Sequence, residues 1–380
     1  RTYHLAHYHP ASPVVKPDRP WETNRGGPTA MVFSDGVWFD PKDQLFKMWY
    51  MSGYVENLAY ATSKDGIHWE KPELDVKQGT NLVFQGRRDS STVWLDLEEK
   101  DPARRYKLFL VPIGRPWRIL LYFSPDGIHW SPPAAESAAI GDRSTAFWNP
   151  FRKVWVMSIR AGNKYGRIRQ YREHPDVVEA VRWKKTDLAP WIGADKLDPI
   201  RSDLKTPCQL YNLDAVAYES ILVGLFSIWR GQPKDRAKPN EIVVGYSRDG
   251  FHWYRPDRRA LIPVSEHRGD WNWGNVQSAG GCLLVVRDKL YFYVSGRAGM
   301  PGSTDSGVSA TGLATLRRDG FASMDAGSRE GTLTTRTIRF RGQRLFVNAA
   351  VQGGELRAEV LDVRGRVIIP FTRKNSIPLR

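Results

Sequence analysis

The stretch TSKDGIHWEKP at Thr62–Pro72 decides the fold, because the chain repeats it. It returns as FSPDGIHWSPP at Phe123–Pro133 and as YSRDGFHWYRP at Tyr246–Pro256. Each copy has the pattern of a strand, an Asp-Gly turn and a second strand that begins with an aromatic residue. Asp-Gly accepts the positive φ of a tight hairpin turn, and the Trp is placed to cover the hairpin. The copies therefore predict a set of equivalent β-hairpins.

Two weaker copies extend the repeat. One is QYREHPDVVEAVRWKKTD around Trp183, and the other is ATLRRDGFASMD at Ala314–Asp325, which keeps Asp-Gly but lacks the Trp. The intervals between copies are about 50 to 70 residues, close to the period of a four-stranded propeller blade. Five copies predict an all-β fold, a five-bladed β-propeller.

β-Branched and aromatic runs between turn residues predict the strands. The inner strands of the blades are expected, in order, in MVFSDGVWFD, STVWLD, STAFWN, LDAVAYES and GGCLLVV. Residues 187–207 are expected to form a loop-like insertion, and SEHRGDWNWGNVQ a polar loop before the inner strand of blade five.

The propeller is expected to span residues 1–328, with an irregular lead-in at 1–30. The lead-in carries three histidines, for which an arm packed on the body is favoured over a metal site: His4, His7 and His9. From Gly331 the segments TLTTRTIRF, RLFVNAAV, ELRAEVLDV and RVIIPF alternate apolar and polar residues. This alternation predicts that residues 329–380 form a small accessory β-sheet, part of a sandwich-like region.

Composition limits the partners. The net charge of +15 favours polyanions such as acidic polysaccharide or phosphate, but the basic residues are scattered and match no nucleic-acid-binding motif. No apolar run approaches the roughly 18 residues of a membrane span. Cys208 and Cys282 are expected to be buried thiols, because they form neither a disulfide framework nor a metal-ligand set. The chain begins with Arg, as after a removed leader or at a sequence boundary, and a secreted or periplasmic location is expected.

Carboxylates recur on the predicted inner strands. Asp35 and Asp214 stand five positions before the turn that ends their strand, and Asp89 and Asp142 stand seven positions before theirs. Because side chains alternate along a strand, equal parity predicts that all four point to the same side, near one mouth of the central channel. The alternative for each is a turn cap, or an ion pair with the adjacent Arg88 or Arg143.

Converging carboxylates suit glycosidic hydrolysis, which needs one ionised and one protonated carboxyl, or they suit binding of a cation such as a structural Ca²⁺. No other metal and no cofactor is expected. Glu219 is a further acid candidate at a strand end. The expected substrate-binding residues are Arg88, Asp89, Arg143, Glu266, Trp271, Trp273 and Arg297.

In the repeated hairpins, in FSDGVWFDPKDQLFKMWY and in GDRSTAFWNPFRKVWVMSIR, the chain resembles the five-bladed β-propeller glycoside hydrolases, the group around families 32, 43, 68 and 130. The resemblance covers about residues 25–325. It implies that Asp35 is the nucleophile or base and that Asp142 orients it and tunes its pKa. It also implies a blade-four acid, for which this chain offers Asp214 or Glu219 where the family has Glu. The Asp-Pro-Asn-Gly and Glu-Cys-Pro motifs of family 32 are absent, so fructan hydrolysis is not implied.

The expected function is hydrolysis of a glycosidic bond in a plant or algal oligo- or polysaccharide, with an anionic substrate favoured by the basic charge. Two alternatives stay open. One is a phosphorylase whose phosphate site is supplied by Arg88, Arg143 and Arg297. The other is a propeller that binds carbohydrate without cleaving it.

Overall fold

The computed structural model describes residues 1–300, 302–339 and 341–380. The chain divides into two compact units. His4–Arg318 form the propeller unit, and Arg1–Tyr3 with Asp319–Arg380 form the terminal unit.

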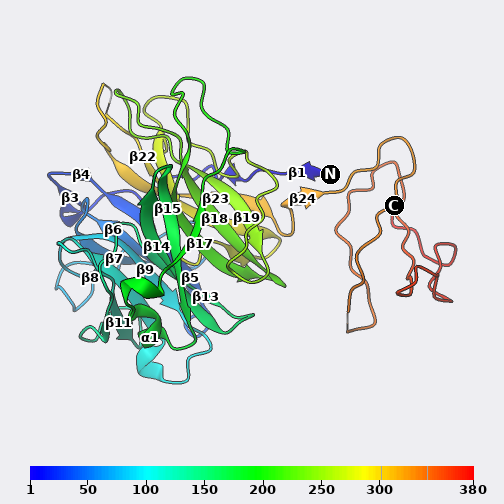
Figure 1. The fold of residues 1–380 in the computed structure, drawn as a ribbon, viewed down its shortest axis with the longest axis horizontal. Coiled ribbons are helices and arrows are strands. Elements are labelled where there is room, and N and C mark those ends of the chain that lie inside the picture. The colour runs from blue at the N-terminus through cyan, green and yellow to red at the C-terminus, as the bar shows by residue number, and fades with distance from the viewer. Residues whose placement is uncertain (301, 340) are drawn as a thin grey trace. The chain divides into compact units, whose positions relative to one another are not determined.

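The propeller unit consists of five antiparallel sheets that follow one another along the chain (Figure 1). Blade one is β5 (Ala30–Asp40), β6 (Leu45–Ser52), β7 (Asn57–Ser63) and β8 (Leu82–Phe84). Blade two is β9 (Arg88–Leu95), β10 (Tyr106–Pro112), β11 (Leu120–Ser124) and β12 (Ala135–Glu136). Blade three is β13 (Thr145–Asn149), β14 (Val154–Asn163), β15 (Gly166–His174) and β16 (Ala189–Gly193). Blade four is β17 (Gln209–Tyr218), β18 (Ile221–Trp229) and β19 (Glu241–Ser247).

Blade five joins the two ends of the propeller unit. It contains β20 (Gly274–Ser278), β21 (Leu284–Val286), β22 (Lys289–Arg297) and β23 (Ser309–Arg317), and its outer strand is β2 (His7–Tyr8) from the start of the chain. The inner strands β5, β9, β13 and β17 contact one another in order, and β20 contacts β5 and so closes the ring. The predicted five-bladed β-propeller is confirmed.

Short elements complete the fold. They are β1 (Thr2–Tyr3) paired with β24 (Ala322–Ser323), β3 (Thr23–Asn24) paired with β4 (Gly27–Pro28), the helix α1 (Val177–Val181), and 3-10 turns at Pro20–Glu22, Pro102–Arg104 and Lys185–Asp187.

The Asp-Gly turns join neighbouring blades. In the second copy, Asp126 Oδ1 accepts the backbone N–H groups of Ile128 (2.8 Å) and His129 (2.9 Å), which fixes the turn. Gly127 has a φ of +80°, and its carbonyl accepts the indole N–H of Trp49 from blade one at 2.7 Å. The first turn is bonded in the same way by Tyr293 Oη on the Gly66 carbonyl, and the third by Asn149 Nδ2 on the Asp249 carbonyl. Each turn therefore holds its blade to the preceding one.

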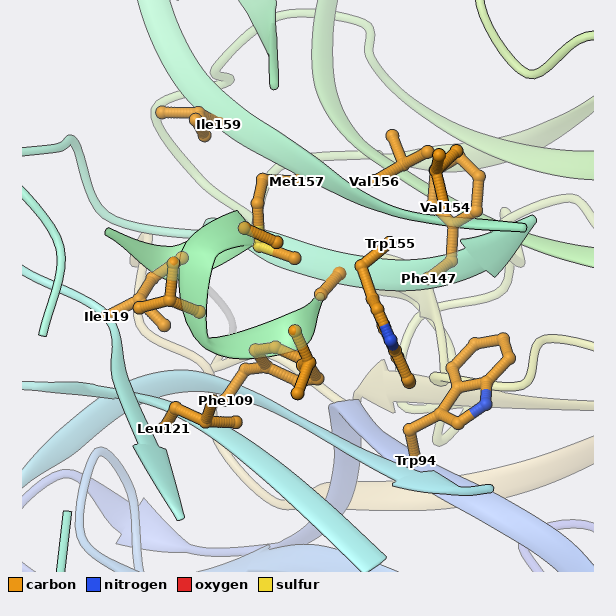
Figure 2. Packing of buried hydrophobic residues seen from close by; sticks show 14 of the residues in the cluster. Trp94, Phe109, Ile119, Leu121, Phe147, Val154, Trp155, Val156, Met157 and Ile159 are labelled. Atoms are coloured by element: carbon orange, nitrogen blue, oxygen red, sulfur yellow. The ribbon is translucent and has the colours of Figure 1, made fainter. Parts of the chain in front are cut away.

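The largest apolar cluster fills the space between blades two and three (Figure 2). The Trp155 ring lies 5.8 Å from the Trp94 ring and 5.6 Å from the Phe109 ring, and all three side chains are buried. Aromatic burial of this kind is the main stabilising contribution at a blade interface.

The predicted hairpin around Trp183 is only partly right: β15 and β16 do pair, but no tight turn joins them. The segment forms the helix α1, in which Asp176 Oδ1 accepts the N–H groups of Val178 (2.8 Å) and Glu179 (3.0 Å) as an N-cap. Val177, Ala180 and Val181 are buried against the aromatic cluster. Their i, i+3, i+4 spacing is that of a helix face, which prevails over the similarity to the repeat.

The inner strand of blade five was predicted only in part: β21 lies within the predicted GGCLLVV segment and pairs with β22, but the longer strand that pairs with β22 was missed. It is β20, the GNVQS segment that sequence patterns assign to a polar loop, and all its residues are buried. The strand was missed because it carries polar side chains, and strands were predicted from runs of apolar residues.

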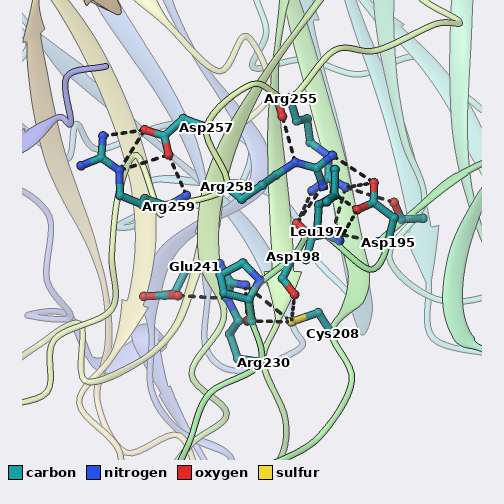
Figure 3. A network of polar contacts seen from close by, with 12 residues as sticks. Asp195, Leu197, Asp198, Cys208, Arg230, Glu241, Arg255, Asp257, Arg258 and Arg259 are labelled. Carbon is teal, nitrogen blue, oxygen red and sulfur yellow. Dashed lines mark hydrogen bonds and ion pairs between the residues drawn. The ribbon is translucent and has the colours of Figure 1, made fainter. Parts of the chain in front are cut away.

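The predicted insertion at 187–207 is partly regular, because its first residues form β16. The remainder is held on blade four by ion pairs (Figure 3). Buried Asp198 receives both terminal nitrogens of Arg255, at 2.6 and 2.9 Å, and Arg258 bonds Asp195 at 2.9 Å.

Residues 324–339 and 341–380 contain no strand, so the four predicted strands of an accessory sheet are not present there. The regular pairing found is limited to the isolated bridges Leu356–Leu379 and Leu361–Val367. Large apolar side chains remain exposed, among them Phe346, Val363, Ile369 and Ile377. The alternating pattern lacks a second layer on which its apolar face could be buried, and without one an isolated sheet is barely stable.

Candidate functional site

Strand β5 is interrupted at Asp35. Its register with β6 runs from Met31↔Met51 directly to Gly36↔Trp49, so four residues of β5 bulge out opposite one. Ser34, inside the bulge, has a φ of +64°, and its carbonyl accepts the N–H of Gly280 from blade five at 3.1 Å. Bulges redirect side chains, and backbone strain of this kind collects at functional sites.

Asp35 is fully buried in an ion pair with Arg88 from blade two. Both carboxylate oxygens receive a guanidinium nitrogen at 2.7 Å, and Ser91 Oγ donates to Oδ1 at 2.5 Å. Neither side chain of the pair is exposed. Burial raises the pKa of Asp35, and the charge of Arg88 opposes that rise.

Asp214 on β17 is buried, and it has no ion pair within the part of the chain that the structure describes. Its Oδ2 accepts hydrogen bonds from Ser34 (2.9 Å), Asn212 (3.0 Å) and Ser278 (2.6 Å). Its Oδ1 is buried and has no hydrogen-bond partner among the described residues. Burial raises the pKa of Asp214, against the charge of Arg143.

Asp89 and Asp142 are the more accessible carboxylates. Asp89 is half-buried, and its Oδ1 accepts the backbone N–H of Arg143 at 3.0 Å. Asp142 has 43% of its side chain exposed and pairs with Arg160 Nε at 3.2 Å. Burial raises the pKa of Asp89, and the neighbouring Asp142 carboxylate raises it further. One carboxyl is thus biased towards its protonated form beside a second that solvent reaches.

Arg143 stands among these carboxylates. Its guanidinium carbon lies 3.7 Å from the centre of the Phe33 ring, and its charge acts on Asp35, Asp89 and Asp214. The residue is 2% exposed, and none of its guanidinium nitrogens has a hydrogen-bond partner among the described residues. The structure therefore places three of the four predicted aspartates, Asp35, Asp89 and Asp214, around one buried cation, and the fourth, Asp142, pairs with Arg160.

Glu219 lies apart from this group. It occupies the turn between β17 and β18, is exposed, and pairs with Arg318 at 3.0 Å. Its φ of +51° is that of a turn residue. Of the two blade-four carboxylates, Asp214 bonds the bulge of β5, whereas Glu219 lies in an exposed turn.

The predicted substrate-binding residues of the Trp-rich segment have structural partners. Glu266 is exposed and bonds Arg201 (2.6 Å) and Arg236 (2.9 Å). Trp271 meets the Tyr8 ring edge-on at 5.4 Å, and Trp273 is buried beneath Arg236 at 4.8 Å. Trp273 is therefore buried against a protein partner, whereas Trp271 stays partly exposed.

A pocket of about 420 Å³ opens beside the starts of β5 and β20. Its wall includes Arg297, which the sequence predicts, and residues that it does not, notably Tyr54, Lys238 and Asn275. Asn275 belongs to the strand that was assigned to a loop. Tyr54 follows the end of β6 and Lys238 precedes β19, positions that no repeat or motif marks.

Arg297 is 6% exposed, and uncharged groups hold it. Its Nη1 donates to Tyr54 Oη (3.1 Å) and to Ser306 Oγ (2.7 Å). The side-chain amide of Asn275 is assigned with its oxygen towards Arg297, because that orientation gives each amide atom a hydrogen-bond partner; the oxygen then accepts from Nε (2.8 Å) and Nη2 (2.7 Å). The charge of Arg297 lowers the pKa of Tyr54.

The described residues contain no group of three or more His, Cys, Asp or Glu side chains arranged to hold a metal ion. Cys282 is buried, whereas Cys208 is only half-buried, with its Sγ 3.3 Å from the Pro199 carbonyl oxygen. Across the described ranges, no helix has both the length and the apolar character needed to cross a membrane.

No known family model matches the chain, and no curated protein matches its sequence. Solved structures do match its fold. An N-acetylgalactosamine deacetylase from F. plautii, in complex with blood group B trisaccharide, is 13% identical with a TM-score of 0.55, over 82% of this chain and 95% of that one. A thermostable family-43 glycoside hydrolase is 11% identical with a TM-score of 0.53, over 81% of this chain and 99% of that one. The chain thus has the five-bladed propeller fold found in glycoside hydrolases, as its sequence resemblance implies.

Proposed function

We propose that the protein hydrolyses a glycosidic bond, with Asp89 and Asp142 as the reacting carboxyl groups. The observation that carries the proposal is the contrast between these two adjacent groups. Asp89 has a raised pKa, and Asp142 is open to solvent. Glycosidases need one protonated and one ionised carboxyl group at the scissile bond.

In the proposed reaction, protonated Asp89 donates its proton to the glycosidic oxygen as the bond to the anomeric carbon breaks. Asp142 takes a proton from the water whose oxygen bonds that carbon, or attacks the carbon first and is then released by water. The products are a free hydroxyl and a hemiacetal, and the two carboxyl groups return to their starting states over the cycle.

Asp35 and Asp214 then serve as positioning residues. The resemblance to glycoside hydrolases assigns the nucleophile to Asp35, but both of its oxygens are bonded to Arg88 and it has no exposed surface. A nucleophile must reach the anomeric carbon, and Asp35 does so only if that ion pair opens. The negative charges of Asp35 and Asp214 instead balance the positive charges of Arg88 and Arg143, which lie next to Asp89 and Asp142.

The test is hydrolysis of a panel of aryl glycosides and acidic plant and algal polysaccharides, the substrate class that the net positive charge favours. Asp89→Asn and Asp142→Asn should each lower the rate by about 10²-fold or more. Asp203→Asn, which alters an exposed aspartate paired with Arg201, is the matched control and should leave the rate unchanged. Full activity in Asp89→Asn would overturn the assignment.

The burial of Asp35 favours a second candidate, a propeller that binds carbohydrate without cleaving it. The deacetylase among the structural neighbours was solved with a trisaccharide, so the fold also accommodates saccharides outside glycosidases. This candidate predicts saccharide binding that persists in both Asn variants and no cleavage of any member of the panel.

A further inference from the structure

The pocket beside β5 and β20 carries positive charge that is not neutralised locally. Arg25, Lys238 and Arg297 line it, and Asp305 is the acidic residue of the lining. Asp305 is exposed and accepts a hydrogen bond from Ser303 Oγ at 2.8 Å. The hydrogen bonds of Arg297 run to Tyr54, Ser306 and Asn275, which are all uncharged.

Lys238 is similarly placed. Its Nζ donates to Tyr211 Oη at 3.1 Å and lies 4.8 Å from the centre of the same ring. An ammonium group has three N–H donors, so Lys238 keeps donors for a ligand after this bond is made. Tyr54 adds a hydroxyl whose lowered pKa reports the positive field of Arg297 and Lys238.

The wall of the pocket holds these groups firmly. Gly26 packs so close to Tyr54 that a Cβ there would lie 2.5 Å from the aromatic ring. Gly27 packs against Gly307, where a Cβ would lie 2.9 Å from the carbonyl oxygen. A pre-formed wall reduces the ordering that a ligand must impose on binding.

A second guanidinium, that of Arg143, lies near Arg297 without lining the pocket. Arg143 and Arg297 both approach the Phe33 ring, at 3.7 and 5.8 Å from its centre. Arg143 is buried and its guanidinium lacks a hydrogen-bond partner among the described residues. The carboxylates of Asp35, Asp89 and Asp214 act on Arg143, so the positive charge left for a ligand is that of Arg297 and Lys238, which line the pocket.

We propose that this pocket binds an oxyanion carried by a saccharide, a carboxylate, sulfate or phosphate ester, with Arg297 and Lys238 as its principal cations. The saccharide part rests on the proposed function, and the oxyanion part rests on the pocket itself. The volume of about 420 Å³ lies within the range of small-molecule sites.

The experiment is calorimetric titration of the full chain with galacturonate, glucuronate, galactose 6-sulfate and glucose 6-phosphate. Neutral galactose and glucose, and inorganic phosphate, are titrated beside them. At least one anionic sugar should bind about tenfold or more tightly than its neutral parent. Lys238→Gln and Arg297→Gln should each weaken that binding by about tenfold or more, with Arg318→Gln, an exposed arginine paired with Glu219, as the unchanged control.

Each other outcome is decisive. Equal binding of neutral and anionic sugars, no binding of any anionic sugar, or unchanged binding in Lys238→Gln overturns the proposal. If Arg297→Gln fails to fold, the half-buried Lys238 carries the test. Inorganic phosphate that binds as tightly as glucose 6-phosphate also overturns it, and indicates a free-phosphate site such as a phosphorylase needs.

The same titration separates this proposal from the hydrolase assignment. Asp89→Asn and Asp142→Asn should bind the anionic sugar as the unmodified chain does. Loss of cleavage with retained binding leaves both proposals standing, whereas binding without any cleavage at all removes only the hydrolase.

Discussion

The Asp-Gly turns and the axial aspartates use the same residue type in opposite ways. At the turns, Asp65, Asp126 and Asp249 bond atoms two or three positions away, and all three copies make the same bonds. Near the axis, Asp35 bonds Arg88, 53 positions away, and Asp214 bonds Ser34, 180 positions away. These two aspartates share no common bonding pattern. Local, repeated bonds build the frame, whereas long-range, unrepeated bonds make the site.

The largest expected effect comes from the axial ion pair. Asp35→Asn leaves the Arg88 charge buried, and arginine cannot shed it, so we expect a loss of about 3–5 kcal/mol of unfolding free energy. Arg88→Met should cost less, because Asp35 can be protonated. Thermal and urea unfolding of the two variants at pH 7 measures the difference.

The pH dependence of stability tests whether protonation of Asp35 is what limits the cost of Arg88→Met. In Arg88→Met the folded pKa of Asp35 lies above its unfolded value, so the contribution of the protonated group is full below about pH 4 and is lost as pH rises. As pH falls from 7, the difference in unfolding free energy between Arg88→Met and the unmodified chain should therefore become smaller. Equal losses in both variants at every pH would contradict this account.

The next effect comes from a turn. In Gly127→Ala the new Cβ would lie 2.4 Å from the Trp49 ring, at a φ of +80°. Overpacking and a left-handed non-glycine residue together cost about 3 kcal/mol.

Gly114→Ala is the matched control for that substitution. Nothing lies within 4 Å of its added Cβ, so its melting temperature should stay within a degree or two of the unmodified chain, an expected change of about 0.5 kcal/mol or less. Similar melting temperatures for the two variants would show that the turn does not hold the blades together.

This contrast explains what the sequence could predict. The Asp-Gly repeats identify the propeller because each turn is complete within its own few residues. The aspartates near the axis were found from position alone, and equal strand parity was an insufficient reason, since the β5 bulge breaks the alternation that it assumes. Arg88 was predicted to contact substrate, yet the structure buries it against Asp35.

No repeat or motif in the sequence marks the remaining residues of the pocket. Tyr54, Lys238 and Asn275 meet only when blades one, four and five close the ring. Glu219 was proposed because it was the nearest glutamate in sequence, and its exposed turn shows that nearness along a strand is not nearness at the axis.

Acid should destabilise the turns, whereas Asp35, whose pKa burial raises, should cost no stability as pH falls. Burial opposes ionisation of Asp126, but hydrogen bonds from His129 and the backbone outweigh it and lower its pKa to about 2, and the pKa values of Asp65 and Asp249 are lowered in the same way. A depressed pKa stabilises the fold above the unfolded value, and that stability is lost as pH falls through the folded value. Melting temperatures should drop between pH 4 and about pH 2. A triple Asp→Asn variant at these positions should show a smaller drop.

The smallest effects should come from the turn histidines. The side chain of His68 is 84% exposed and bonds Asp65, so His68→Ala should cost about 0.5 kcal/mol. His129 also bonds Asp75 at 2.9 Å, and the bond to Asp126 and then that to Asp75 raise its pKa. Its contribution should be full below about pH 6 and fade as pH rises, so His129→Ala should cost more at pH 5.5 than at pH 8. Equal losses of unfolding free energy at both pH values would contradict the raised pKa of His129.

The closing strand β2 bears on how the protein is made. Its partner β23 ends at Arg317, so the pairing of His7 with Thr315 cannot form until nearly all of the propeller unit has been synthesised. Until then the ribosome carries four blades with two open ends, and Ala30 and Val32 of β5 lack the Thr311 hydroxyl that bonds their backbone. Blade five, the last to be synthesised, therefore supplies the Thr311 hydroxyl that completes the hydrogen bonding of blade one.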